Sequence, residues 1–370
     1  MNNIKVCHLT SVHTINDVRI FVKECASLAA NGFDVTLIAC GDTAFEDTKN
    51  GVKRVSLNVP ANNRLQRMIK RTRSVYRKAL QVDADIYHFH DPELIPVGLK
   101  LIKRGKRVIY DVHEDVPRDI LSKEWIIKPI RKIISYCFQY YENRAIKSFS
   151  YVLTSTPFIR DRFIPFCEKV IDINNYPLME EFDSSVNWEE KEQAICYIGA
   201  ITRVRGIGAV VESMQYSKGK LYLAGTFDYE NFRNELKKSK GWSNVVEMGP
   251  VDRVAAKEIL SKAIAGLVVF WSEPNHVNSQ PNKMFEYMSA GIPVIGSNFE
   301  FWKTIIEKNG CGICVDPMNP LEIANAINYL LNNPNIAEEM GKRGRNAIES
   351  QYNWDCEDKK LFDVYNSFGS

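Results

Sequence analysis

The chain has 370 residues, 45% of them hydrophobic and 25% charged, which is enough for two globular domains of ordinary composition. No stretch approaches the roughly 18 consecutive apolar residues of a transmembrane helix, and the N-terminal MNNIKVCHLTSV lacks the basic and long apolar regions of a signal peptide. Of the nine cysteines only Cys311 and Cys314 are close in sequence, and no second ligand pair nearby completes a zinc site. We therefore expect buried thiols in a reducing cytosol.

The formal net charge of +3 is unevenly distributed along the chain. Residues 1–150 hold 25 Lys and Arg against 16 Asp and Glu, a net charge of +9. Residues 151–370 hold 23 against 29, a net charge of −6. The basic first half predicts a surface that faces an anionic partner.

Short β-branched runs alternate with longer amphipathic runs in residues 1–170. The amphipathic run over 19–32 ends at a glycine, as helices commonly do. This alternation is typical of βαβ units and predicts a parallel sheet covered by helices. The strands expected in this first domain are 5–12, 34–40, 85–90, 107–113 and 151–155.

A polar, acidic and proline-containing stretch over 171–193 interrupts the alternation and predicts a linker. The alternation then resumes, so we expect a second α/β domain over 194–350 and a terminal helix over 351–370 that packs back toward the first domain. The predicted fold class is α/β, with two doubly wound Rossmann-like domains facing each other across a cleft. The strands expected in the second domain are 194–200, 220–226, 244–249, 264–271, 292–297 and 312–315.

Ligands of open α/β sheets bind beyond the carboxyl ends of the strands, so the residues that follow each strand carry the most information. In YIGAITRVRGIG, a strand ends at Gly199, and Arg203 and Arg205 precede a predicted helix. Guanidinium groups beside a helix N-terminus form an anion site that suits a diphosphate. A solvated loop with two exposed arginines is the alternative.

Two histidines follow neighbouring strands of the first domain. In HFHDPEL, His90 ends a strand, and Asp91 and Pro92 can begin a helix, with Asp91 as its N-cap. His113 ends the next strand, so both rings should lie at the same rim, although a lone histidine is more often structural than catalytic. The polar residues that we expect near this rim are His13, Asp91, His113 and Glu114.

The stretch NSQPNKMFEYMSAGIPVIGS, residues 278–297, places one carboxylate, Glu286, inside an apolar helical run. A carboxylate there can accept two hydrogen bonds from a vicinal diol such as a ribose. The preceding loop up to Lys283 can offer backbone N–H groups to a phosphate or a sugar.

Taken together and in this order, these stretches resemble the family 4 glycosyltransferases of the GT-B fold. That family has two Glu residues separated by seven others, and the spacing from Asn278 to Glu286 is the same. YIGAITRVRGI resembles the family's diphosphate-binding loop, and His90 matches the family's histidine at the donor sugar. The resemblance covers nearly the whole chain. NSQPNKMFEYM further resembles a branch of bacterial polysaccharide enzymes that read NSxPNKxFEYM.

The resemblance implies a role for each matching residue. Glu286 would hold the ribose of a nucleotide-sugar donor, Arg203 and Arg205 its diphosphate, and His90 would position the donor sugar. Gly249 and Val251 match the loop that meets the base through its backbone. The remaining residues expected to bind the donor are Gly199, Asn278, Ser279 and Lys283. The residues that would lie on the acceptor side are His13, Asp91, His113 and Glu114.

The resemblance also implies transfer of a hexosyl or N-acetylhexosaminyl group, from a UDP-sugar by family frequency, to a glycan or polyprenyl-diphosphate-linked glycan. The anomeric configuration would be retained, and neither a metal nor another cofactor would be required. Two residues depart from the family pattern: Asn278 replaces the first Glu, and Ala200 replaces an Arg that often follows the loop glycine. Arg205 stands where the family usually has a lysine.

Two basic and apolar segments, 63–81 and 125–141, predict contact with an anionic membrane surface. Residues 64–78 alone contain seven Lys or Arg. Nucleic acid is a competing anion, but the sequence contains no nucleic-acid-binding motif and the second half is acidic. A plain solvated helix is the other alternative for 63–81. We expect a cytoplasmic protein at the inner face of the plasma membrane, with no nucleic-acid partner.

Two other functions stay open at this point. The loss of charge at Asn278 and Ala200 suits a former transferase that binds a nucleotide sugar or a glycan as a scaffold, without turnover. A nucleotide-sugar epimerase of the same fold would need neither an acceptor nor a membrane surface.

Overall fold

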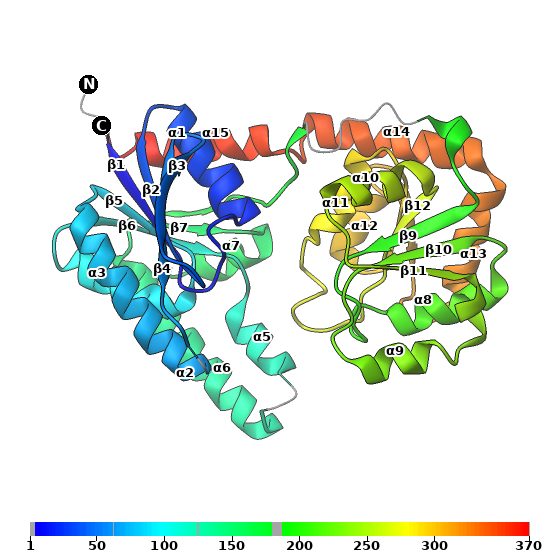
Figure 1. The fold of residues 1–370 in the computed structure, drawn as a ribbon, viewed down its shortest axis with the longest axis horizontal. Helices are drawn as coiled ribbons and strands as arrows, with labels where there is room; N and C mark the ends of the chain where they lie inside the picture. The colour runs from blue at the N-terminus through cyan, green and yellow to red at the C-terminus, as the bar shows by residue number, and fades with distance from the viewer. Residues whose placement is uncertain (1–3, 62, 124–125, 180–186, 370) are drawn as a thin grey trace. The chain divides into compact units, whose positions relative to one another are not determined.

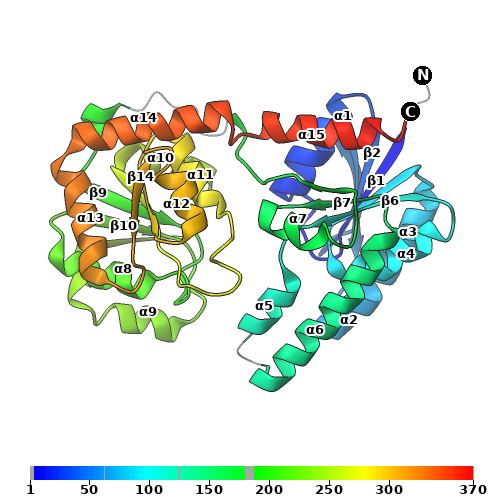
Figure 2. The ribbon, with the colours of Figure 1, turned by 180° about the vertical axis from the view of Figure 1, so that it is seen from behind.

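The computed structural model describes residues 4–61, 63–123, 126–179 and 187–369. The chain forms two compact units, one of Met1–Asn175 with Asp355–Ser370 and the other of Tyr176–Trp354. Each unit is a largely parallel sheet flanked by helices (Figures 1 and 2), which confirms the prediction of two Rossmann-like domains. Residues 180–186 of the expected linker, and Trp125 at the start of the second basic segment, lie outside the described residues.

The N-terminal unit contains an eight-stranded sheet in the order β3-β4-β2-β1-β5-β6-β7-β8. Only β3 is antiparallel, where it pairs with β4. The first-domain strands expected from the sequence correspond to β1, β2, β5, β6 and β7. The strand bounds are β1 Lys5–Leu9, β2 Asp34–Gly41, β3 Phe45–Lys49, β4 Val52–Asn58, β5 Ile86–Phe89, β6 Arg107–Val112, β7 Tyr151–Thr154 and β8 Val170–Asp172.

The helices of this unit connect successive strands, and the last helix of the chain, α15, joins them. Two of the helical segments, η1 and η2, are π-helical. In a π-helix, hydrogen bonds join backbone groups of residues five positions apart, so each turn is wider than in an α-helix. The helical bounds are η1 Val18–Cys25, α1 Ala26–Ala30, α2 Arg64–Gln66, η2 Arg67–Arg71, α3 Thr72–Val82, η3 Pro92–Leu94, α4 Ile95–Ile102, α5 Val116–Ser122, α6 Lys128–Ala145, η4 Ile146–Ser148, α7 Pro157–Phe163 and α15 Trp354–Asn366.

The two faces of this sheet differ in chemistry because side chains alternate along a strand. Cys7 and Leu9 of β1, and Tyr87 and Phe89 of β5, belong to the apolar core on one face. The intervening histidine of β1, His8, therefore projects from the other face. His8 pairs with His88 in the β1–β5 register, so the two imidazoles lie side by side, with ring centroids 4.4 Å apart. Tyr365 of α15 lies against both rings on this face.

The C-terminal unit contains a six-stranded, all-parallel sheet in the order β11-β10-β9-β12-β13-β14. Its strands match the six expected from the sequence, and each face carries its own apolar core. Ile195 and Tyr197 of β9 contribute to one core, and Cys196 between them contributes to the other. The strand bounds are β9 Ala194–Ile198, β10 Lys220–Ala224, β11 Val245–Gly249, β12 Ala265–Val268, β13 Val294–Ser297 and β14 Gly312–Val315.

The helices of this unit follow its strands in the expected alternation. Their bounds are η6 Trp188–Glu190, α8 Ile207–Ser213, η7 Met214–Tyr216, α9 Glu230–Leu236, η8 Lys240–Asn244, α10 Arg253–Lys262, α11 Asn282–Ser289, α12 Glu300–Ile306, α13 Pro320–Asn332 and α14 Pro334–Ser350. Across both units, none of the helices in the described ranges has the length and apolar content to cross a membrane.

Three neighbouring strands of the C-terminal unit end in glycines with positive φ, at Gly199, Gly225 and Gly249. The backbone N–H of Gly225 donates to the carbonyl of Gly249 at 2.7 Å, and a Cβ atom on Gly225 would stand 1.8 Å from the carbonyl oxygen of Gly199. The strand ends are therefore packed backbone to backbone. Only glycine fits at Gly225, because both its conformation and its neighbours exclude a side chain.

Candidate functional site

Lys283 and Arg205 converge on the carboxyl end of β9 in the C-terminal unit. Lys283 lies in the first turn of α11 and is 7% exposed. A Cβ atom on Gly199 would stand 2.7 Å from Nζ of Lys283 and 3.6 Å from Nη1 of Arg205, so the missing side chain leaves room for both cations. Among the described residues, Nζ of Lys283 makes no hydrogen bond and neither cation has an ion-pair partner. Two unpaired cations at a strand end form a site for an anion.

The environment of Lys283 disfavours its own positive charge. Burial, and then the nearby guanidinium of Arg205, lower the pKa of Lys283 well below the usual lysine value. The aromatic ring of Tyr197, whose centroid is 3.8 Å from Nζ, offers partial compensation through a cation–π contact. An anionic ligand would supply the missing counter-charge.

Arg203, the other arginine of the loop, already has a counter-ion in the described structure. Its guanidinium forms an ion pair with Glu235, with Nη1 and Oε1 2.8 Å apart, and stacks on the ring of Phe232. Both partners of the ion pair are about half exposed. The structure therefore brings Arg205 together with Lys283 and pairs Arg203 with Glu235.

Glu286 lies on α11, the helix that carries Lys283, and the loop with Asn278 and Ser279 directly precedes this helix. Glu286 is half-buried, and its Oε1 lies 3.8 Å from Nη1 of Arg253. Ser279 holds the loop in place, because its hydroxyl donates to the carbonyl of His276 and its own carbonyl accepts from Nε1 of Trp302, each at 2.8 Å. Asn278 is half-buried in the same loop.

Gly249 and Val251 flank the end of β11, two strands from β9. Gly249 has a φ of 70°, and Val251 packs partly against the apolar core. Asp252 then caps α10 by accepting from the backbone N–H of Ala255 at 2.9 Å. This turn presents backbone groups at the same end of the sheet as Gly199.

In the N-terminal unit, His90 is buried, at 2% exposure, and both of its ring nitrogens are engaged. Its Nε2 lies 3.0 Å from Nδ1 of His8, and its Nδ1 lies 3.1 Å from Oδ2 of Asp111 and 3.1 Å from Nε2 of His113. Asp111 in turn binds the guanidinium of Arg19 through two hydrogen bonds of 2.8 and 3.0 Å. His90 therefore offers no free nitrogen at the surface of this unit.

The charges of this cluster follow from burial and from the Arg19–Asp111 pair. Burial lowers the pKa of His90 to about 4 and lowers the pKa values of His8 and His88 well below normal, so these imidazoles are neutral at neutral pH. Although burial opposes ionisation of Asp111, Arg19 holds the pKa of Asp111 well below its usual range.

The acceptor-side candidates occupy the more exposed edge of this cluster. The His13 ring lies 3.3 Å from Oδ2 of Asp17 and 3.5 Å from Oδ1 of Asp91. Burial alone would lower the pKa of His13, but these carboxylates raise it above the usual value. The His13 and His113 rings are 4.9 Å apart, whereas Glu114 is exposed and, within the described structure, joins neither ring.

Asp91 occupies the N-cap position of η3, as expected, but its side chain does not cap that helix. Its Oδ2 accepts from Oγ1 of Thr10 at 2.9 Å and from the backbone N–H of Ser11 at 2.5 Å. Asp91 therefore fixes the loop after β1, which carries His13.

Sequence reasoning missed several members of the N-terminal cluster. His8 and His88 could have been identified because they are polar residues inside apolar strands. Arg19 and Glu24 could have been identified because they are charged residues inside an apolar helical run. The contacts of Tyr365 with His8 and His88 could not be predicted from the sequence, because these residues are about 280 positions or more apart in the chain.

Comparison with known proteins identifies the family. Residues 19–171 match the family "Glycosyltransferase Family 4", and residues 179–347 match "Glycosyl transferases group 1", so the two matches cover most of the chain. The chain is 24% identical over 207 residues to the capsular polysaccharide biosynthesis glycosyltransferase CapM of Staphylococcus aureus, which covers 53% of this chain and 51% of CapM. The chain spans about half the length of the first curated relatives that it matches.

Solved structures show the same fold at low identity. Sucrose-phosphate synthase from Thermosynechococcus elongatus matches with a TM-score of 0.80 and 17% identity over 99% of both chains. HepE of Anabaena in complex with UDP matches with a TM-score of 0.72 and 12% identity, over 99% of this chain and 100% of HepE. The chain therefore belongs to the family 4 glycosyltransferases and has their GT-B fold of two Rossmann-like domains.

Proposed function

We propose that this protein transfers a sugar from a UDP-sugar to a hydroxyl group of a glycan or a lipid-linked glycan, in the synthesis of a bacterial surface polysaccharide. The observation that carries the proposal is the buried, unpaired ammonium group of Lys283 beside Arg205 at the end of β9. The diphosphate of the donor supplies the two negative charges that this pair lacks. UDP in the complex of HepE, and the role of CapM in capsule synthesis, support the choice of donor and pathway.

The chemistry requires stabilisation of a departing diphosphate, which Lys283 and Arg205 supply electrostatically together with the N-terminus of α11. Two fixed cations make a bound metal at the diphosphate unnecessary, so we propose transfer without a metal cofactor. Glu286 binds the ribose through its carboxylate, and the anomeric configuration of the sugar is retained, as the family resemblance implies. Arg203 contributes less than Arg205, because Glu235 already neutralises it.

On the acceptor side, His13 and His113 are the exposed members of the N-terminal cluster. His90 acts as a positioning residue, because its Nδ1 and the Nε2 of His113 share the Asp111 carboxylate. Asp91 positions His13 through the loop after β1.

A lipid-linked acceptor is supported by α6, which is the core of the second basic segment. Of its 18 residues only Ser135, Glu142 and Ala145 are buried. The apolar side chains that α6 and the residue before it leave exposed are Ile127, Ile130, Ile133, Ile134, Tyr136, Tyr140 and Tyr141.

Lys128, Arg131 and Lys132 lie among these apolar residues, as in helices that bind anionic membrane surfaces. The first basic segment, 63–81, contributes less. Val75 and Ala79 there are buried in the core, and Arg71 is bonded to the carbonyls of Val59 and Ser11. We therefore propose that α6 is the main membrane contact.

The donor assignment is tested by calorimetric titration of UDP into Arg205→Ala and Arg203→Ala. Each charge-assisted hydrogen bond contributes about 1.5–3 kcal/mol, so Arg205→Ala should weaken UDP binding by roughly 10- to 100-fold. Arg203→Ala should have a much smaller effect, and Lys308→Ala, at an exposed lysine of the same unit, should have none. Equal losses for the two arginines would contradict the proposed geometry.

An assay for product formation distinguishes a glycosyltransferase from a binding scaffold and from a nucleotide-sugar epimerase. Incubation with a UDP-sugar and a glycan acceptor, followed by NMR of the product, should show a new glycosidic bond with the anomeric configuration of the donor. Tight UDP binding without product in a broad acceptor screen would favour the scaffold. A free, epimerised nucleotide sugar would identify an epimerase.

A further inference from the structure

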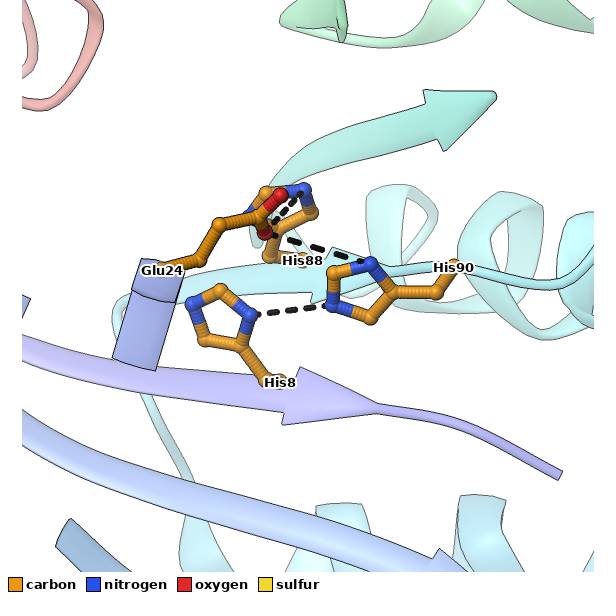
Figure 3. Close-up of side chains that lie close together, drawn as sticks. All are labelled: His8, Glu24, His88 and His90. Atoms are coloured by element: carbon orange, nitrogen blue, oxygen red, sulfur yellow. Dashed lines mark hydrogen bonds and ion pairs between the residues drawn. The ribbon is translucent and has the colours of Figure 1, made fainter. Parts of the chain in front are cut away.

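Three histidines and one glutamate meet in the interior of the N-terminal unit, on the polar face of its sheet (Figure 3). His8 comes from β1, His88 and His90 from β5 and the residue after it, and Glu24 from η1. One donor atom from each lies within 4.8 Å of those from the other three. All four side chains are at most 2% exposed.

Two separations between donor atoms of the cluster are close to those of a tetrahedral metal site. Nδ1 of His8 and Nε2 of His90 are 3.0 Å apart, and Nε2 of His88 and Oε2 of Glu24 are 3.9 Å apart. Bonds of 2.0–2.1 Å in a tetrahedral zinc site place neighbouring donor atoms about 3.3 Å apart. On binding an ion, the His8 and His90 nitrogens would therefore move slightly apart, and the His88 nitrogen and the Glu24 oxygen would move closer together.

Each imidazole already has a hydrogen-bond partner on its outward nitrogen, as metal-binding histidines normally do. Nε2 of His8 lies 3.2 Å, and Nδ1 of His88 lies 2.8 Å, from the hydroxyl of Tyr365. Nδ1 of His90 lies 3.1 Å from the carboxylate of Asp111. The nitrogens that these partners leave available to an ion are Nδ1 of His8, Nε2 of His88 and Nε2 of His90. The nitrogen of His90 nearest Glu24 is Nδ1, 4.0 Å from Oε2, so the His90 ring would turn when an ion binds.

Without an ion, the hydrogen bonds of the cluster end on an unpartnered atom. Asp111 accepts a hydrogen bond from Nδ1–H of His90, so Nε2 of His90 carries no proton and accepts a hydrogen bond from Nδ1–H of His8. Nε2 of His8 then accepts from the hydroxyl of Tyr365, whose oxygen accepts from Nδ1 of His88. This chain leaves a bare lone pair on Nε2 of His88, and neither that atom nor Oε2 of Glu24 makes a hydrogen bond in the described structure.

We propose that this cluster binds one structural zinc ion through His8, His88, His90 and Glu24. Three imidazoles and a carboxylate are ligands that zinc prefers, and four protein ligands leave no open position for substrate. The ion would join β1, β5 and η1, and Tyr365 would connect the site to α15. The proposal is independent of the proposed transferase activity and does not involve the donor diphosphate.

The neighbouring group of His90, Asp111 and His113 is also close enough to hold an ion. Both oxygens of Asp111 are already hydrogen-bonded to Arg19. Arg19 also lies beside Glu24, with its Nε 3.1 Å from Oε1, but Oε2 of Glu24 makes no hydrogen bond in the described structure. The two unpartnered atoms, Nε2 of His88 and Oε2 of Glu24, belong to the first group. The structure therefore favours the site with Glu24.

The test is the metal content of full-length, untagged protein purified without chelator, measured by inductively coupled plasma mass spectrometry. We expect about one zinc per chain after gel filtration. Protein unfolded and refolded with a chelator should contain no zinc and unfold at a lower temperature, and refolding with Zn²⁺ should restore both values. Refolding with Co²⁺ should give the visible absorption of tetrahedral cobalt.

Substitutions then locate the ion. His88→Gln and Glu24→Gln should each lose the bound zinc, whereas His276→Gln, the same type of change in the C-terminal unit, should retain it. Wild-type protein that contains no zinc after purification and after refolding with Zn²⁺ would overturn the proposal. Full retention of zinc by folded His88→Gln would overturn it equally, and the cobalt spectrum of the wild-type protein decides the matter if the variants do not fold.

Discussion

Replacement of Lys283 by methionine should stabilise the C-terminal unit while abolishing donor binding. Lys283 is 7% exposed in the wild-type protein, and its buried ammonium group has no hydrogen bond or ion pair among the described residues, so folding removes a charge from water without a partner. Methionine has a similar length, and its sulfur would lie against the rings of Tyr197 and Phe270, which are near Nζ in the wild-type protein.

Replacement of buried charged groups by apolar groups of similar volume is often neutral or stabilises the folded protein by about 1–4 kcal/mol. In a unit of this size, each kcal/mol shifts the unfolding midpoint by roughly 2–4 °C. Lys283→Met should therefore raise the midpoint by several degrees at neutral pH, measured by calorimetry without nucleotide. Lys308→Met, at an exposed lysine, should leave it nearly unchanged.

The gain should also depend on pH. The pKa of Lys283 is lowered by folding, so the unfolded chain binds more protons between the folded pKa and the ordinary lysine value of about 10.4. Wild-type stability consequently rises with pH through that window, and the advantage of Lys283→Met should shrink as pH approaches its upper end. A methionine variant less stable than wild type at neutral pH, or one that still binds UDP with full affinity, would refute this reasoning.

Three further changes test other parts of the structure. Glu286→Ala should weaken UDP binding by roughly 10- to 100-fold in a calorimetric titration if its carboxylate holds the ribose, and unchanged affinity would exclude that role. Gly225→Ala should destabilise the C-terminal unit by at least about 2 kcal/mol in denaturant unfolding, because its Cβ would stand 1.8 Å from the carbonyl oxygen of Gly199; a neutral effect would mean that the strand ends can separate. Ile133→Glu on α6 should reduce sedimentation with anionic vesicles and change stability by less than about 0.5 kcal/mol, whereas Leu321→Glu in the C-terminal unit should leave sedimentation unaffected. Undiminished sedimentation of the α6 variant would exclude α6 as the membrane contact.

The sheets could be predicted where the pattern of apolar residues was strong. The buried strands β12 and β13, and the largely buried strand β9, are short, mainly apolar runs of the kind that indicates a buried parallel strand. Strand β3, FEDTK, was missed because it is a largely exposed edge strand that pairs only with β4 and carries no apolar alternation. Strand β4 was missed with it, and its partly charged sequence VKRVSLN is consistent with a place near the edge.

The candidate site could be predicted in composition but not in geometry. The sequence indicated where strands end and which cationic residues follow them, so Gly199, Arg205 and Lys283 were predicted as site residues. Which cation pairs with which was not visible, because Arg203 is neutralised by Glu235, a residue 32 positions away. The burial of His90 was equally invisible, since it depends on His8, 82 residues earlier.

The most direct test of the proposed function is thermal unfolding of the wild-type protein with UDP, GDP, ADP and CMP in turn. A ligand at a hundredfold excess over its Kd stabilises the folded state by about 2.7 kcal/mol. The proposal predicts a higher midpoint with UDP than with the other nucleotides, a smaller shift in Arg205→Ala and no shift in Lys283→Met. An unchanged midpoint with all four nucleotides would contradict a nucleotide-diphosphate site at Lys283 and Arg205, and with it the assignment of this chain as a nucleotide-sugar transferase.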